Sequence, residues 1–197
     1  MTRSDLAALV GSRICHDLIS PIGAIGNGME LLSLTDGDTS AEMSLISDSV
    51  DNANARIRYF RIAFGASNPD QRVGRSEILS ILAATAKGGR FTYFWQPEGD
   101  QPRHMVRCAL LGLLCIETAL PLGGDIHISR DGDNWTLTGE GRRINVDQEL
   151  WDSLTDPDSG FRHSPAQVQF ALLPDVLAEQ DRSLHRDQTD TRITLQF

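Results

Sequence analysis

Two amphipathic stretches near the start of the chain constrain the fold more than any other feature. Apolar residues recur three or four positions apart, first between residues 6 and 34 and again between residues 43 and 64. The first series is Leu6, Leu9, Val10, Ile14, Leu18, Pro21, Ile22, Ile25, Met29 and Leu32, and the second is Met43, Ile46, Val50, Ala53, Ile57, Phe60 and Phe64. This spacing is typical of helices that bury one face. Because a short polar turn at 35–39 joins the two stretches, the sequence predicts a helical hairpin.

Neither helix of this hairpin is able to bury its apolar stripe alone. The second stripe keeps the three-four alternation for three heptads, which is the pattern of a coiled-coil seam. Two copies of the hairpin would cover both stripes by forming a four-helix bundle. We therefore expect a homodimer.

His16 lies outside the first stripe. It is two residues from both Ile14 and Leu18, and two residues correspond to a rotation of about 200° around a helix. We therefore expect the imidazole to point away from the buried face, where it is free to act as a nucleophile. Asp17 is expected to accept a hydrogen bond from one ring nitrogen and so to fix the tautomer.

Composition excludes several classes of function. The 197 residues carry a net charge of −9, which argues against nucleic acid as the main partner. Lys87 is the only lysine and has no glycine at the spacing of a phosphate-binding loop. The N-terminus shows no secretory signal, and the longest apolar run, from Cys108 to Ile116, is too short to span a membrane. The three cysteines include no CxxC pair, and Cys108 and Cys115, seven apart on an apolar helix, indicate buried thiols, so we expect a reduced, cytoplasmic protein without a metal site.

The pattern changes after a polar linker at 65–70, which predicts two domains, residues 1–66 and 74–197. The second is expected to alternate helices and strands. Its predicted elements are helix 76–87, strand 90–95, a helix at 102–121 that is apolar nearly all round, strands 125–130 and 135–140, helices 147–154 and 165–180, and a closing hairpin within 183–197. This order predicts an α+β sandwich that follows a helical hairpin.

The run from Arg13 to Gly28 reads Arg-Ile-Cys-His-Asp-Leu-Ile-Ser-Pro-Ile-Gly-Ala-Ile-Gly-Asn-Gly. Its His-Asp-Leu-x-x-Pro core resembles the phospho-acceptor box of sensor histidine kinases. The full run resembles the ChpT-type histidine phosphotransferases of alphaproteobacteria. The resemblance implies that His16 relays a phosphoryl group from the receiver of a hybrid histidine kinase to response-regulator receiver domains. Mg²⁺ would then come from the partner receiver.

By the same resemblance, the second domain is a degenerate copy of the histidine-kinase ATP-binding domain. Working kinases of that fold carry Mg²⁺-binding asparagines on the buried helix, followed by Asp-x-Gly-x-Gly. The segment from Leu110 to Leu122 has no asparagine, and Thr138-Gly139-Glu140-Gly141-Arg142 lacks the aspartate. We therefore expect a phosphotransfer protein without ATP binding, without a cofactor of its own and without autokinase activity.

Residues expected to contact a partner surround His16. They are Arg13, Ile19, Ser20, Gly23 and Arg56, although Arg56, with Arg58 and Arg61 on the same helix, has the alternative interpretation of a solvated basic face. Two other functions stay open. One is an ATP-dependent histidine kinase with an unusual nucleotide site, which would need a substitute ligand such as Glu117. The other is a non-catalytic dimeric adaptor in which His16 is never phosphorylated.

Overall fold

The structure, a computed structural model, describes residues 3–34, 38–68, 70–156 and 160–197, so most of the predicted turn at 35–39 lies outside the described residues. Helices and strands follow one another in the order α1 (Arg3–Leu34), α2 (Ser40–Ala63), β1 (Arg72–Val73), α3 (Arg75–Ala86), β2 (Phe91–Trp95), β3 (Gln101–Pro102), α4 (Arg103–Ala119), β4 (Gly124–Asp131), β5 (Asn134–Glu140), α5 (Gln148–Asp152), the 3₁₀ turn η1 (Pro165–Gln167), α6 (Val168–Ala178), β6 (His185–Gln188) and β7 (Arg192–Gln196).

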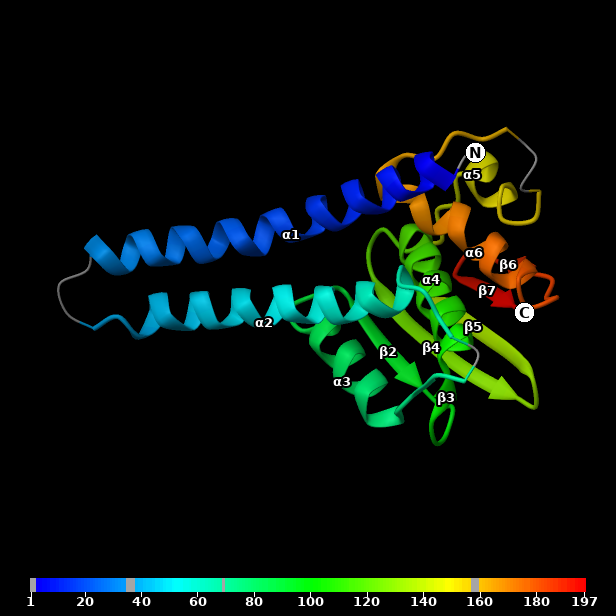
Figure 1. Ribbon diagram of the computed structural model, residues 1–197, viewed down its shortest axis with the longest axis horizontal. Helices are drawn as coiled ribbons and strands as arrows, with labels where there is room; N and C mark the ends of the chain where they lie inside the picture. The colour runs from blue at the N-terminus through cyan, green and yellow to red at the C-terminus, as the bar shows by residue number, and fades with distance from the viewer. Residues whose placement is uncertain (1–2, 35–37, 69, 157–159) are drawn as a thin grey trace.

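Helices α1 and α2 lie side by side as a long hairpin that extends well beyond the rest of the molecule (Figure 1). They approach each other closely at Gly28, where an added Cβ would lie 2.7 Å from Cγ1 of Ile46. Gly23 and Gly26 lie on the exposed surface of α1, and an added Cβ at either would meet no atom within 4 Å. Of these three glycines, only Gly28 is therefore needed for packing within the hairpin.

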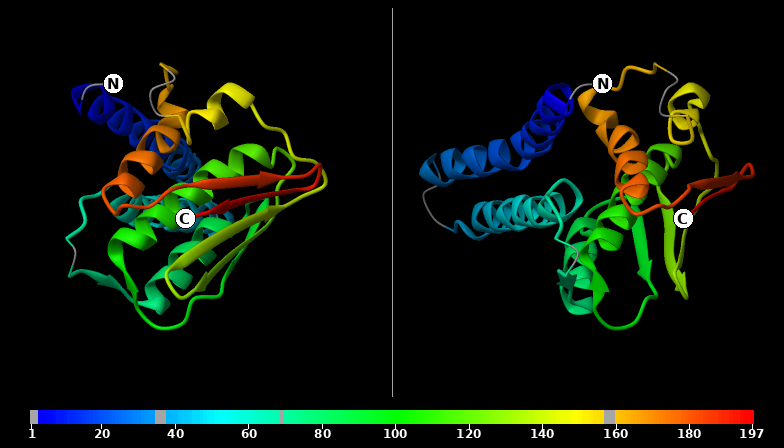
Figure 2. Two further views of the ribbon diagram at one scale, coloured as in Figure 1. Left: turned by 90° about the vertical axis from the view of Figure 1, so that its right-hand side faces the viewer. Right: turned by 45° about the vertical axis from the view of Figure 1, so that its right-hand side comes forward.

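The C-terminal half of the chain forms a five-stranded sheet in the order β2-β4-β5-β7-β6. Strands β2 and β4 are parallel, and every other neighbouring pair is antiparallel. Helices α3 and α4 pack on one face of this sheet, and α6 packs on α4 (Figure 2). The alternate residues of β4, β5 and β7 that face the helices are buried, namely Ile126, Ile128, Trp135, Leu137, Ile193 and Leu195.

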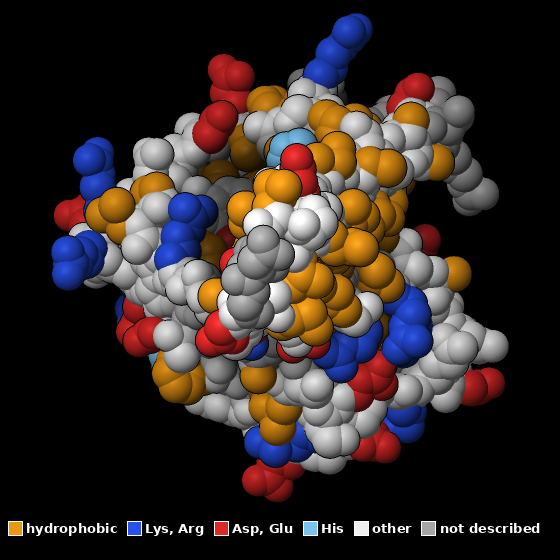
Figure 3. Space-filling view, turned by 90° about the vertical axis from the view of Figure 1, so that its left-hand side faces the viewer, with side chains coloured by type: hydrophobic (Ala, Val, Ile, Leu, Met, Phe, Trp, Pro, Cys, Tyr) orange, Lys and Arg blue, Asp and Glu red, His pale blue; other side chains and the backbone are white. Residues whose placement is uncertain are grey.

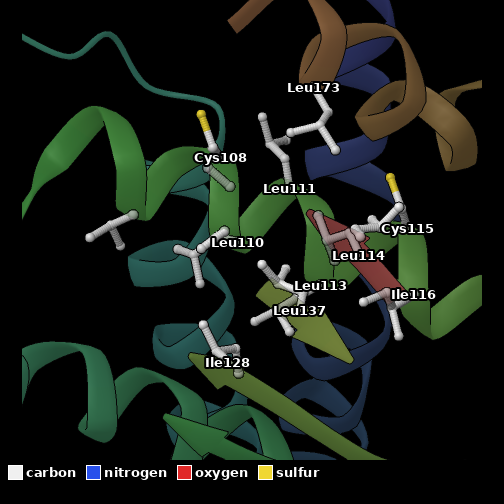
Figure 4. Close-up of a cluster of buried hydrophobic side chains, with 14 of the residues drawn as sticks. Cys108, Leu110, Leu111, Leu113, Leu114, Cys115, Ile116, Ile128, Leu137 and Leu173 are labelled. Carbon is white, nitrogen blue, oxygen red and sulfur yellow. The ribbon is translucent and has the colours of Figure 1, made fainter. Parts of the chain in front are cut away.

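Helix α4 is the centre of the hydrophobic core. Every residue from Cys108 to Ile116 is buried, because the sheet, α2 and α6 all pack around this helix (Figure 4). Cys108 and Cys115 are buried free thiols, as predicted. The helix approaches β5 closely, since an added Cβ at Gly139 would lie 2.3 Å from Cγ2 of Ile116.

The base of the hairpin belongs to the same core. Tyr59, Phe60, Ile62 and Ala63 of α2 are buried in the cluster that contains α4. The Tyr59 hydroxyl donates a hydrogen bond of 2.6 Å to the Leu110 carbonyl, so one of the few polar atoms at this contact is paired. The first turns of α1 also pack partly against the cluster, through Leu6, Leu9, Val10 and Ile14.

The predicted α+β class with an N-terminal helical hairpin is confirmed. The two-residue strands β1 and β3, which pair with each other, were not expected. None of the helices in the described ranges is both long enough and apolar enough to cross a membrane.

The close approach of α4 to β5 gives a stability prediction. The substitution Gly139→Ala should lower the free energy of unfolding by about 1–3 kcal/mol, because the new methyl group overlaps Ile116 in a packed core. Gly11→Ala is the matched control, since it fills open space on an exposed helix and should raise stability by up to about 1 kcal/mol. Denaturant unfolding followed by circular dichroism measures both changes. Equal stability of the two variants would contradict this account of the packing.

Candidate functional site

His16 lies on the solvent side of α1, as its spacing from Ile14 and Leu18 predicts. Its side chain is 81% exposed. The ring nitrogen Nδ1 lies 3.0 Å from Oδ1 of Asp17, within hydrogen-bond distance. An ionised carboxylate can only accept a hydrogen bond, so in the neutral ring Nδ1 carries the proton and Nε2 keeps its lone pair. A ring in this state has its unprotonated nitrogen available for attack on an electrophile.

The second carboxylate oxygen of Asp17 contacts two arginines. Its side chain is only 10% exposed, and Oδ2 lies 2.8 Å from Nε of Arg13 and 3.6 Å from Nη1 of Arg56. The first arginine is one turn earlier on α1, and the second comes from α2. With one oxygen bound to His16 and the other bound between two arginines, the carboxylate has little freedom to turn away from the ring.

Both arginines are themselves held by other groups. Nη1 of Arg13 donates a hydrogen bond of 2.6 Å to the carbonyl of Ala166 in η1, and Nε of Arg56 donates one of 3.0 Å to Oδ1 of Asn52. The Arg13 side chain is only 17% exposed, whereas that of Arg56 is 41% exposed. Arg13 therefore links the helix that carries His16 to the C-terminal half of the chain.

The other predicted contact residues lie around the exposed ring. Ile19 is 69% exposed, and Ser20 and Gly23 are also on the surface of α1. The structure brings Arg13 and Arg56 together at Asp17, while Ile19, Ser20 and Gly23 continue along the helix from His16. Contact of these five residues with a partner stays a prediction.

A cavity of about 290 Å³ lies behind Asp17, between the hairpin and the C-terminal half of the chain. On its far wall the hydroxyl of Tyr93 in β2 donates a hydrogen bond of 2.8 Å to Oε1 of Glu117 in α4. Burial raises the pKa of Glu117 to about 7, and the Tyr93 hydrogen bond and three nearby arginines only partly oppose that rise. The pKa of Tyr93 is also raised, first by burial and then by the Glu117 charge.

Neither Tyr93 nor Glu117 was among the residues predicted for this site. A signal was present, since Glu117 is the single charged residue between Cys108 and Leu120 on an otherwise apolar helix. Within the described residues, no group of three His, Cys, Asp or Glu side chains is placed to hold a metal ion.

Comparison with known proteins gives three similarities. The model of the histidine phosphotransferase C-terminal domain matches residues 75–192. The protein phosphotransferase ChpT of Brucella abortus (strain 2308) is 32% identical over 196 residues, which cover 94% of this chain and 92% of that protein. A solved structure described as a bacterial phosphotransferase superposes with a TM-score of 0.83 at 28% identity, covering 100% of this chain and 97% of the other.

Proposed function

Because the chain belongs to the family of ChpT-type histidine phosphotransferases, and so acts in phosphotransfer within a phosphorelay, we propose that His16 is the residue that carries the phosphoryl group. The observation that carries the proposal is the exposed ring whose Nδ1 is bound to Asp17. Nucleophilic catalysis needs an accessible atom with a lone pair and a neighbouring group that orients it. Nε2 of His16 meets the first requirement and Asp17 the second.

The transfer would proceed by in-line attack. Nε2 of His16 attacks the phosphorus of an aspartyl phosphate on a receiver domain, so that a nitrogen–phosphorus bond forms as the phosphorus–oxygen bond breaks. The receiver aspartate leaves as a carboxylate. The ring gains positive charge while Nδ1 keeps its proton, and the Asp17 carboxylate stabilises that charge. The reverse reaction on a second receiver passes the group on.

The partners we propose are receiver domains, one from a hybrid histidine kinase as donor and others from response regulators as acceptors. They would contact the surface around His16 that includes Ile19, Ser20, Gly23 and Arg56. Phosphoryl transfer depends mainly on positioning and on neutralising charge at the transferred group. The receiver would supply Mg²⁺ for that purpose, so this chain would need neither a metal ion nor ATP.

The direct test is to incubate the protein with a phosphorylated receiver domain and to map acid-labile phosphate by mass spectrometry. We expect the phosphate on His16. A parallel incubation with radioactive ATP and Mg²⁺, without any receiver, should leave the protein unlabelled. Labelling by ATP alone would favour the kinase alternative, and absence of label from the receiver would favour the adaptor.

We also propose that the working unit is a homodimer. The part of the hairpin that extends beyond the core exposes two apolar stripes, and Figure 3 shows hydrophobic side chains gathered along it. These stripes contain Ile22 and Met29 on α1 and Met43, Val50 and Ile57 on α2, each 40–61% exposed. Gly26 lies in the first stripe and would allow a second helix to approach closely. A second copy of the hairpin would cover both stripes in a four-helix bundle.

Charges placed in the α2 stripe should therefore separate the dimer. We expect Val50→Asp combined with Ile57→Asp to change the mass in solution from two chains to one, measured by light scattering after gel filtration. Leu122→Asp is the control, because Leu122 is also an exposed apolar residue but lies outside the hairpin. The double variant should keep its helical circular dichroism, since both substituted residues lie outside the buried core. A wild-type protein that is monomeric at micromolar concentration would contradict the proposal.

A further inference from the structure

The cavity behind Asp17 lies where three parts of the fold meet. Arg13 and Asp17 come from α1, Arg56 and Phe60 come from α2, and the remaining wall comes from the C-terminal half of the chain. That wall includes Thr85, Arg90, Phe91, Tyr93, Leu114 and Glu117. Ligand sites in proteins occur preferentially at such junctions, in cavities that combine apolar walls with a few polar groups.

The charges around this cavity are unequal. Three guanidinium groups, those of Arg13, Arg56 and Arg90, face two carboxylates, those of Asp17 and Glu117. The cavity therefore has a net charge of +1 when Glu117 is ionised and +2 when it is protonated. Arg13 is bound to both Asp17 and the Ala166 carbonyl. In contrast, no hydrogen bond of the Arg90 guanidinium is seen among the described residues. The Arg90 guanidinium carbon lies 5.2 Å from the centre of the Phe91 ring.

The rest of the lining is apolar. Ala55, Phe60, Phe91 and Leu114 contribute carbon surface, and Leu114 is almost fully buried. A volume of about 290 Å³ is enough for a molecule with one ring or a short carbon chain. The cavity thus offers arginines for an anionic group and apolar side chains for the body attached to it.

We propose that this cavity binds a small organic anion, whose carboxylate or phosphate group contacts Arg56 and Arg90 and whose apolar body packs against Phe91 and Leu114. Arginine binds both groups through paired hydrogen bonds, and the two are distinguished by the choice of probe.

Binding should depend on pH through Glu117. This carboxylate faces Tyr93 from β2, Tyr59 and Arg56 from α2, Arg13 from α1 and Arg90. Its pKa of about 7 means that it gains a proton as the pH falls below neutral. Because protonation removes a negative charge from the cavity wall, an anion should bind more tightly at low pH than at high pH. By linkage, the bound anion should raise the pKa of Glu117 further.

Occupancy should also affect His16, an effect that rests on the function proposed above. Arg56 contacts Asp17 at 3.6 Å, and Asp17 orients the imidazole. An anion that draws Arg56 towards the cavity would leave Asp17 with Arg13 alone. Saturation with the anion should therefore slow phosphoryl transfer to His16 several-fold.

Calorimetry on the wild-type protein, without any receiver, tests the site independently of phosphotransfer. The probes are benzoate, phenyl phosphate, the neutral match benzyl alcohol and inorganic phosphate, which lacks an apolar body. We expect benzoate to bind at least about tenfold more tightly than benzyl alcohol and inorganic phosphate, and the comparison with phenyl phosphate shows whether the site prefers a carboxylate or a phosphate group. Benzoate should bind several-fold more tightly at about pH 6 than at about pH 8, since Glu117 titrates between these values.

Two variants test whether the anion binds in this cavity. Glu117→Gln should remove the pH dependence and bind benzoate at pH 8 as well as the wild type does at pH 6. Arg90→Ala should weaken binding about tenfold, whereas the control Arg143→Ala, at an exposed residue outside the cavity, should not. The absence of saturable anion binding at pH 6, or binding unchanged in both Glu117→Gln and Arg90→Ala, would overturn the site. Binding at the site with an unchanged rate of transfer would overturn only its coupling to His16.

Discussion

The substitution His16→Ala should abolish phosphate flow between two purified receiver domains, a loss of at least about 10³-fold relative to the wild type. The expected effect is this large because, in the proposed mechanism, the side chain forms the covalent intermediate, and no neighbouring group in the described residues replaces it. Its exposed neighbours along α1 include Cys15, Ile19 and Ser20. The measurement is the time course of radioactive phosphate moving from a labelled donor receiver to an acceptor receiver.

His185→Ala is the matched control, because His185 is an exposed histidine on β6 in the C-terminal half of the chain. It should transfer phosphate at the wild-type rate. The His16→Ala protein should also keep its stability within about 0.5 kcal/mol, since the lost ring is 81% exposed. Phosphate flow that continues at the wild-type rate in His16→Ala would leave the adaptor function as the better account.

The second large effect is expected for Asp17→Asn, which should slow phosphoryl uptake about 10²-fold. An asparagine of the same shape is neutral and can turn its amide towards His16. Nδ1 would then be free to give up the proton, and the proton would move to Nε2, the atom that must attack. The neutral amide would also no longer stabilise the charge that the ring gains during transfer. Single-turnover kinetics with a phosphorylated receiver measures the change.

The tautomer of the His16 ring shows whether Asp17→Asn slows transfer by changing the protonation of the ring or by disturbing the structure. Nitrogen NMR of ring-labelled protein should show the proton of His16 on Nδ1 in the wild type and more often on Nε2 in Asp17→Asn. Asp48→Asn is the control, because Asp48 lies on α2 of the same hairpin and the substitution breaks only an exposed ion pair with Lys87 at the end of α3. A wild-type rate in Asp17→Asn with an unchanged tautomer would exclude the proposed role of Asp17.

The regular parts of the fold follow from periodicity. Helix α1 contains the whole first apolar series and is described as far as Leu34, and α4 was identified by its continuous apolar sequence. Strands β1 and β3 were missed because a two-residue strand carries no period. The parallel pairing of β2 with β4 also could not be predicted from the sequence of either strand. It depends on α4, which connects the two strands by crossing over the sheet. Among the glycines of α1, the sequence did not distinguish the buried Gly28 from the exposed Gly23 and Gly26, because only the position of α2 separates them.

The candidate site was predictable only where it is local in sequence. The direction of His16 follows from helix geometry, and the adjacent Asp17 was identified with it. The contacts of Arg13 did not follow, because its second partner is the Ala166 carbonyl, which is 153 residues away. Tyr93 and Glu117 were missed for the same reason, since the fold brings β2 and α4 to the back of the hairpin.

The hydrogen bond between Arg13 and Ala166 has a consequence for how often the protein can turn over. It keeps the helix that carries His16 seated on the C-terminal half of the chain. In the proposed mechanism, His16 can therefore stay in place on the fold while receiver domains bind and dissociate. Throughput would then be set by the abundance of those partners and by how quickly each one leaves.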